Sequence, residues 1–207
     1  MTDFRKQEFI IFDVETTGLS PRWGDRIVEI AAIRIKNLKP VENFYSFVDP
    51  QKEISWGAFQ VNGITEEMLI GAPTAKEILP RFLEFIGRGA LIGHNIGFDL
   101  SFLCHELSLL GLRLKKETVI IDTLKIARHL LPHLSRYPLW HVAESLGIRK
   151  TQEHRAMADV TLTFDVFCRL LKKINGEEDI VEIGVLPDAW EKYHIDERQG
   201  QERIFKW

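Results

Sequence analysis

The chain has 207 residues, a formal net charge of −3 and a sequence pI near 6.2, which argue against a protein that coats duplex nucleic acid through a broad basic face but leave a local binding site possible. Its 45% hydrophobic content is enough for one domain with a sizeable core. No apolar run approaches the roughly 18 residues that a membrane-spanning helix needs, and the opening MTDFRKQ lacks the apolar stretch of a signal peptide. We therefore expect a cytoplasmic protein with no membrane association.

Strand-like residues dominate the first part of the chain, and helical spacing follows. Short, turn-rich connections favour an antiparallel meander of three strands, at 8–15, 26–36 and 41–48. Helical spacing then recurs over five segments, at 74–87, 98–110, 123–131, 139–146 and 156–173. Short apolar strands lie between these helices at 90–93 and 118–122. Pro80 stands inside the first helix, where proline removes a hydrogen bond. The order predicts a mixed sheet flanked by helices.

Two acidic residues stand at the end of the first predicted strand. Because side chains alternate along a strand, Asp13 and Glu15 project to one face, about 6.6 Å apart along the strand. That separation lets both carboxylates reach one divalent cation, and two like charges beside an apolar core need such a cation. Taken alone, Asp-x-Glu more often marks a strand that ends in solvent, with Thr16, Thr17 and Gly18 as its turn.

Acidic residues recur at the start of two predicted helices. In GHNIGFD, Asp99 lies in or near a first helical turn, where the helix dipole tolerates an anion. An acidic residue there is ordinary, and Asn95 can serve simply as a cap. In EHRAMAD, His154 comes just before a helix, and Asp159 lies beside the buried stripe of that helix. A solitary histidine before a helix is more often a capping or surface residue than a base.

Together, the motifs DVETTGL, HNIGFD and HRAMAD resemble the DEDDh branch of the DnaQ-like 3′–5′ exonucleases, a family that includes ribonuclease T and epsilon-type proofreading subunits. Their order, their distances and their expected positions at a strand end and two helix starts agree over approximately residues 7–173. The resemblance implies an α/β, ribonuclease H-like fold. Its five-stranded mixed sheet would be an antiparallel meander followed by parallel strands, flanked by helices.

The resemblance also implies a site in which four carboxylates hold two Mg²⁺ or Mn²⁺ ions. Asp13 would bridge both ions, with Glu15 and Asp159 helping to bind one of them. Asp99 would support the other mainly through water, and His154 would be the general base. Two hard cations about 3.5–4 Å apart serve the attacking and the leaving oxygen of a phosphodiester together, and hard cations prefer oxygen ligands. An imidazole with a pKa of about 6.5 changes protonation near neutral pH.

Residues beside these motifs are expected to contact the substrate. In the family, the turn formed here by Thr16, Thr17, Gly18 and Leu19 borders the terminal nucleotide, with an apolar residue such as Leu19 against a base. Phe98 is a second candidate for base contact, because stacking on an aromatic ring tolerates any base. For Leu19 and Phe98, packing into the core is the alternative.

Asn62 and Asn95 complete the predicted substrate-binding set. Family members commonly carry His-Gly-Ile before the first long helix, with the histidine close to the terminal nucleotide, whereas this chain has Asn62 in VNGIT. Asparagine can still hydrogen-bond a phosphate or a sugar, but the departure leaves the preference for DNA or RNA open. Asp122 ends a strand before a helical stretch, so we expect it to cap that helix and assign it no metal.

The end of the chain contains a short stretch that loosely matches a known binding motif. QERIF resembles the Gln-Leu-x-Leu-Phe pentapeptide by which bacterial replication proteins bind the sliding clamp, with Gln201, Ile204 and Phe205 in register. Glu202 stands where the motif has leucine. A tail whose apolar residues fold back on the domain is the more frequent arrangement. Binding to a clamp would nevertheless help an acidic nuclease that holds its substrate weakly, because a second attachment raises the effective concentration of the enzyme near its substrate.

The sequence therefore predicts an exonuclease domain at 1–175 and a C-terminal extension or tail at 176–207. The expected reaction is metal-dependent hydrolysis at the 3′ end of single-stranded or frayed DNA, which releases nucleoside 5′-monophosphates in epsilon-like proofreading or repair. One alternative is the same site acting on RNA or oligonucleotide 3′ ends. The other is a non-cleaving, nucleic-acid-binding replication scaffold, against which the presence of all five catalytic residues argues.

Overall fold

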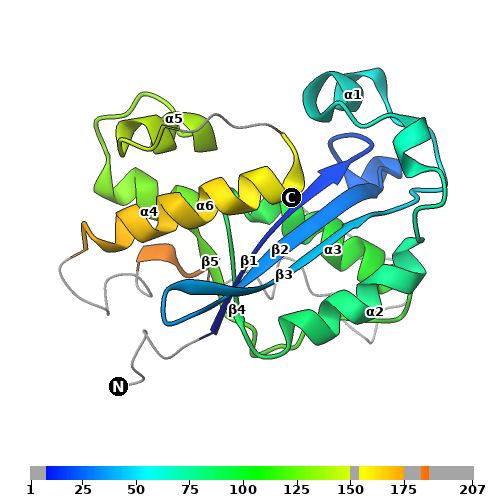
Figure 1. The fold of residues 1–207 in the computed structure, drawn as a ribbon, viewed down its shortest axis with the longest axis horizontal. Helices are drawn as coiled ribbons and strands as arrows, with labels where there is room; N and C mark the ends of the chain where they lie inside the picture. The colour runs from blue at the N-terminus through cyan, green and yellow to red at the C-terminus, as the bar shows by residue number, and fades with distance from the viewer. Residues whose placement is uncertain (1–7, 150–153, 175–182, 187–207) are drawn as a thin grey trace.

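A five-stranded mixed sheet forms the centre of the fold (Figure 1). The computed structural model describes residues 8–149, 154–174 and 183–186. The strands are β1 (Glu8–Thr16), β2 (Ile27–Lys36), β3 (Lys39–Phe47), β4 (Ala90–Gly93) and β5 (Ile120–Asp122), in the spatial order β3-β2-β1-β4-β5. The first three pair antiparallel, and β4 and β5 extend the sheet in parallel from β1. The predicted meander followed by parallel strands is confirmed.

Helices cover both faces of the sheet (Figure 1). One face packs against α2 (Ala75–Ile86) and α3 (Gly97–Leu109). The other packs against α4 (Thr123–Leu130), α5 (Leu139–Ser145) and α6 (Ala156–Leu171). These five helices agree with the predicted segments, and α2 continues through Pro80. The sequence pattern does not predict α1 (Trp56–Asn62), whose 7 residues are too few to show a helical period.

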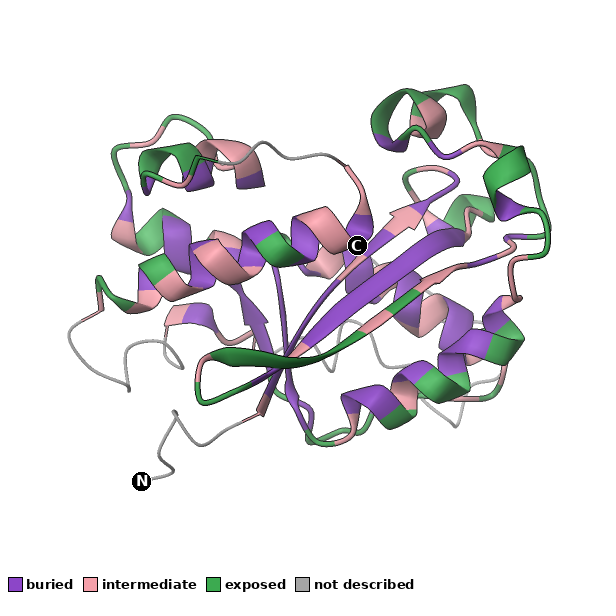
Figure 2. Ribbon diagram, viewed as in Figure 1, coloured by how far each residue is buried: buried purple, intermediate pink, exposed green. Residues whose placement is uncertain are grey.

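The alternation of β1 decides which way its acidic residues point. Phe9 and Ile11 belong to the buried cluster beneath α4, α5 and α6, whereas Ile10 and Phe12 belong to the cluster beneath α2 and α3. Figure 2 shows the central strands as buried and the outer sides of the helices as partly exposed. Asp13 and Glu15 lie an even number of positions from Phe9 and Ile11, so their side chains point to the same side of the sheet. Both carboxylates therefore project from the face that carries α6.

The two edges of the sheet differ. β3 is the outer strand on one side, and most of its residues are exposed. On the other side, Val185 forms an antiparallel bridge with Ile121, and the backbone N–H of Leu186 donates to the carbonyl of Ile120 at 3.0 Å. Part of the predicted C-terminal extension therefore contacts the domain, and the division at 175 stays a prediction.

The proposed clamp-binding residues Gln201, Ile204 and Phe205 lie outside the residues that the structure describes. The clamp contact is therefore untested and stays a prediction. Within the described ranges, no helix is both long enough and apolar enough to cross a membrane.

Candidate active site

Three carboxylates converge where β1 ends beside the start of α6. Asp13 and Glu15 come from β1, and Asp159 lies in the first turn of α6. One carboxylate oxygen from each residue lies within 4.8 Å of an oxygen from each of the other two. The alternation of β1 brings the first two acids to one face, and the packing of α6 on that face adds the third.

Asp99 approaches the same point from the opposite side of the sheet. It is buried in the first turn of α3, and its Oδ1 accepts a hydrogen bond from the backbone N–H of Val14 at 3.0 Å. Asp99 lines the same cavity as the other acids, although it stands outside the group of three. This bond ties the start of α3 to the strand that carries the first two acids.

Burial and mutual repulsion disfavour the charged forms of these acids. Burial, followed by the charges of Asp99 and Glu15, raises the pKa of Asp13 well above its ordinary value. Burial, followed by the charges of Asp159 and Glu29, raises the pKa of Glu15 to about 8. Burial also raises the pKa of Asp99 to about 8, against the opposing hydrogen bond from Val14.

A divalent cation fits this donor set. Carboxylate oxygens within 4.8 Å of one another can share one ion whose ligand distances are about 2.0–2.6 Å. A cation would also remove the repulsion that raises the pKa values of Asp13 and Glu15. The residues therefore suit a hard metal ion, because all of them offer oxygen.

His154 stands immediately before α6 and lines the cavity together with the acids. Its backbone is in the left-handed region, with φ 50°. For a residue other than glycine this conformation is strained, so the surrounding structure must hold it. The next residue, Arg155, forms an ion pair with Glu29 at 2.7 Å.

Glu29 fixes the start of α6, and the sequence interpretation missed it. It lies on β2 opposite Glu15 and is fully buried. Its carboxylate accepts hydrogen bonds from the Arg155 guanidinium at 2.7 Å, from the Tyr45 hydroxyl at 2.7 Å and from the backbone N–H of Ala156 at 2.8 Å. The available signal was a glutamate inside the apolar run IVEIAAI, since a buried charge requires partners.

We expect Glu29→Gln to lower the free energy of unfolding by about 2–3 kcal/mol, because Arg155 and the first amide of α6 lose a charged acceptor. The partly exposed Arg155 side chain keeps this cost below that of a fully buried pair. Urea denaturation measures it. Glu42→Gln, which removes the exposed partner of Arg34, is the control and should cost less than about 1 kcal/mol. Equal costs for the two variants would contradict the anchoring role of Glu29.

A cavity of about 590 Å³ opens above the acidic cluster. Six of the seven predicted substrate-binding residues line it, namely Thr16, Gly18, Leu19, Asn62, Asn95 and Phe98. Leu19 is 80% exposed, so it is available to a ligand rather than packed in the core. Phe98 is half-buried and also packs against Phe102, with ring centroids 5.1 Å apart. Its ring therefore belongs both to the core and to the cavity wall.

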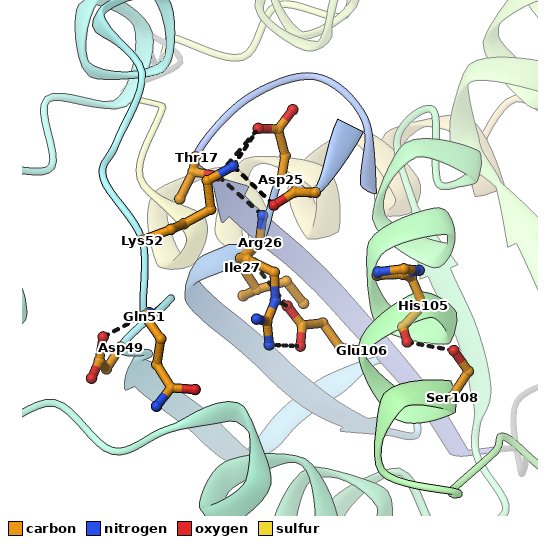
Figure 3. A network of polar contacts seen from close by, with 11 residues as sticks. Thr17, Asp25, Arg26, Ile27, Asp49, Gln51, Lys52, His105, Glu106 and Ser108 are labelled. Carbon is orange, nitrogen blue, oxygen red and sulfur yellow. Dashed lines mark hydrogen bonds and ion pairs between the residues drawn. The ribbon is translucent and has the colours of Figure 1, made fainter. Parts of the chain in front are cut away.

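Thr17 is the predicted substrate contact that is not among the residues lining this cavity, and its side chain stabilises the turn instead. It is fully buried, and its hydroxyl accepts a hydrogen bond from the backbone N–H of Arg26 at 3.0 Å. Figure 3 shows it beside Asp25, which also pairs with Lys52 at 3.2 Å. A Cβ atom on Gly18 would approach the Asp25 carboxylate within 2.4 Å. Glycine is therefore required where the turn closes on Asp25.

The turn is also tied to α3. The Arg26 guanidinium donates two hydrogen bonds to Glu106, at 2.6 Å and 2.7 Å (Figure 3). The Glu106 carboxylate is almost fully buried, so this paired geometry holds the base of the turn firmly against the helix. Leu19 is thus presented to solvent by a turn with a fixed base.

The two asparagines also make structural contacts. The Asn62 side chain donates to the carbonyl of Thr16 at 3.3 Å and accepts from the backbone N–H of Ile64 at 3.1 Å. Asn95 has φ 62°, and its backbone N–H donates to Asp122 at 2.9 Å. Asp122 caps α4, as expected from the sequence. Both asparagines therefore shape the cavity wall.

Known proteins resemble this chain over most of its length. A sequence model of the family described as "Exonuclease" matches residues 10–167. DNA polymerase III PolC-type from Caldanaerobacter subterraneus subsp. tengcongensis is 41% identical over 178 residues, which are 85% of this chain and 12% of that protein. The 3′-5′ exonuclease DinG from Bacillus subtilis is 34% identical over 169 residues, which are 82% of this chain and 18% of that protein. The chain thus spans a small part of both relatives.

A solved structure is similar over nearly its whole length. Exonuclease X in complex with 5′ overhanging duplex DNA aligns with a TM-score of 0.67 and 25% sequence identity. The match covers 84% of this chain and 98% of that chain.

Proposed function

Because the chain belongs to the exonuclease family, we propose that it is a metal-dependent 3′–5′ exonuclease that removes nucleotides from single-stranded or frayed DNA ends. The products would be nucleoside 5′-monophosphates. The observation that carries this proposal is the convergence of Asp13, Glu15 and Asp159 at a cavity of about 590 Å³. DNA is favoured over RNA because the relatives include a DNA polymerase and an exonuclease solved with DNA. A cytoplasmic location is proposed with this role.

Four acids would hold the divalent cations, with Mg²⁺ or Mn²⁺ as the ions that suit carboxylate ligands. Asp13, Glu15 and Asp159 are close enough to share an ion, and Asp99 stands beside them. When bound, the cations supply an activated water and neutralise charge on the reacting phosphate.

The chain's own residues supply the rest of the site. His154 is the group that accepts a proton from the attacking water, since His154 lines the same cavity as the acids. Leu19 and Phe98 are the apolar surfaces against which the terminal base would lie. Glu29 and Arg155 hold the backbone on which His154 depends.

Digestion of end-labelled oligonucleotides tests the proposal. DNA and RNA strands of one sequence, labelled at the 5′ end, are incubated with Mg²⁺ or Mn²⁺ and, separately, with EDTA. We expect ladders that shorten from the 3′ end, faster for DNA, and no cleavage in EDTA. Faster cleavage of RNA would favour the alternative substrate, and binding without cleavage would favour the scaffold. Release of the first product as a mononucleotide from a 3′-labelled strand distinguishes exonuclease from endonuclease activity.

A further inference from the structure

A second cavity, of about 460 Å³, adjoins the first. Asp13, His94, Asn95 and His154 line both cavities. Beyond these shared residues the second cavity is lined by α4, α5 and the segment between them, whereas the first extends toward the β1–β2 turn and α1. Figure 1 shows α5 and α1 on opposite sides of the end of β1. The acidic cluster therefore lies between two adjoining hollows.

The wall between the cavities is held by His94. Its Nδ1 lies 2.9 Å from the Thr123 hydroxyl, and its Nε2 lies 2.8 Å from the carbonyl of Tyr137. Burial lowers the pKa of His94, which favours the neutral ring. Both ring nitrogens are thus engaged inside the protein, so His94 fixes the position of the segment before α5.

The two cavities differ in charge. Among the described residues that line the first cavity, there is no lysine or arginine. The second cavity has Arg128, which is exposed and lies 5.9 Å from the centre of the Tyr137 ring. Trp140 also lines it, and the Arg136 guanidinium lies 4.8 Å from a ring centre of this tryptophan. A cavity that offers both a cation and aromatic rings suits a single strand, because phosphates pair with the cation and bases stack on the rings.

The charge of the surrounding segment is consistent with this difference. Residues 124–149 contain one acidic residue, Glu144, and four basic residues, Lys125, Arg128, Arg136 and Arg149. The whole chain, in contrast, has a formal net charge of −3. The second cavity therefore opens within a locally basic stretch of an acidic protein, which suits a phosphate-bearing ligand.

The chemistry of a 3′ end decides which nucleotide each cavity receives. The terminal nucleotide carries one phosphate, the scissile one, which must lie at the acidic cluster. Every further phosphate of the strand lies on the 5′ side. A cation that lies away from the acidic cluster can therefore pair only with a phosphate on the 5′ side of the scissile bond. The cavity that has no such cation suits the terminal nucleoside.

From this we infer that the second cavity binds the strand on the 5′ side of the scissile bond, with Arg128 contacting a phosphate and Trp140 contacting a base. The inference rests on the proposed exonuclease function and adds a second binding subsite to it. Arg128 then acts in selecting polynucleotides over single nucleotide esters, and it takes no part in bond cleavage.

Two substrates separate the subsites. The p-nitrophenyl ester of thymidine 5′-monophosphate has a terminal nucleotide and a cleavable phosphate but no 5′ neighbour. A ten-nucleotide DNA strand has both. We expect Arg128→Gln to lower the ratio of kcat/KM for the strand to kcat/KM for the ester by about tenfold, because a charge-assisted phosphate contact is lost. The slope of log KM for the strand against log salt should fall by about 0.7.

Arg81→Gln, an exposed arginine on α2 that lines neither cavity, is the matched control and should leave the ratio unchanged. Arg128→Lys should restore most of the ratio, since a lysine still offers a point charge to phosphate. An unchanged ratio and salt slope in Arg128→Gln would overturn the second subsite. If the unaltered protein cleaves neither substrate with Mg²⁺ or Mn²⁺, the exonuclease function itself has failed, and the subsite falls with it.

Discussion

Replacing Asp13 with asparagine is expected to slow cleavage of 3′ ends by roughly a thousandfold or more, because this carboxylate stands at the centre of the acidic cluster. It lies within reach of Glu15 and Asp159, and Asp99 lines the same cavity, so the charges of all three raise its pKa. Removing one charge from such a group also relieves repulsion. The metal-free variant should therefore melt at the same temperature as the unaltered protein or higher. Initial rates of ladder formation and thermal melting in EDTA measure the two effects.

Glu84→Gln provides the control for charge. Glu84 is an exposed carboxylate on α2, so its loss changes the net charge equally without touching the site. Its rate should match that of the unaltered protein. An Asp13→Asn protein that keeps more than a tenth of the activity would show that catalysis does not depend on this carboxylate, and the proposed metal site would have to be abandoned.

The metal-free protein is expected to become less stable as the pH rises from about 5 to about 8. Unfolded acidic side chains lose their protons near pH 4, whereas the folded protein holds them on Glu15 and Asp99 until about pH 8. The raised pKa values therefore add stability below pH 4, and that contribution is lost as the pH passes through the folded values. One pKa unit is worth about 1.4 kcal/mol, so even a small part of these shifts lowers the melting temperature by several degrees.

Divalent cations should reverse this trend, because they bind the deprotonated acids. We expect Mg²⁺ or Mn²⁺ to raise the melting temperature by several degrees at pH 8 and by much less at pH 5. Melting curves in EDTA and in excess metal, recorded at each pH, measure both effects. A melting temperature in EDTA that stays level between pH 5 and pH 8 would contradict the strained acidic cluster.

Local patterns were enough to predict the elements that carry the site. The strand period places Asp13 and Glu15 on one face, and the cap position of Asp122 follows from its place between a strand and a helix. A proline inside a helix argues against the continuity of that helix. The helix α2 nevertheless continues through Pro80, with apolar side chains buried on the side that faces the core. Burial of that apolar face outweighs the loss of one backbone hydrogen bond.

Features that depend on distant contacts could not be predicted in this way. Glu29 and Arg155 are 126 positions apart, and they meet because α6 packs across β2. Nothing in the local sequence around either residue indicates the other. The burial of Thr17 likewise depends on the path of the turn back to Arg26, and the cavity beside Arg128 depends on how α4 and α5 lie.

The outer strand β3 bears on how copies of the protein behave when concentrated. An open strand edge offers free amides and carbonyls to a neighbouring molecule, which is a common route to aggregation. Here Pro40 has no amide to offer, Lys39 and Glu42 add exposed charge, and the pairing with β2 is irregular near Arg34. These features discourage intermolecular strand addition, so a long exposed edge is compatible with a protein that does not polymerise through its sheet.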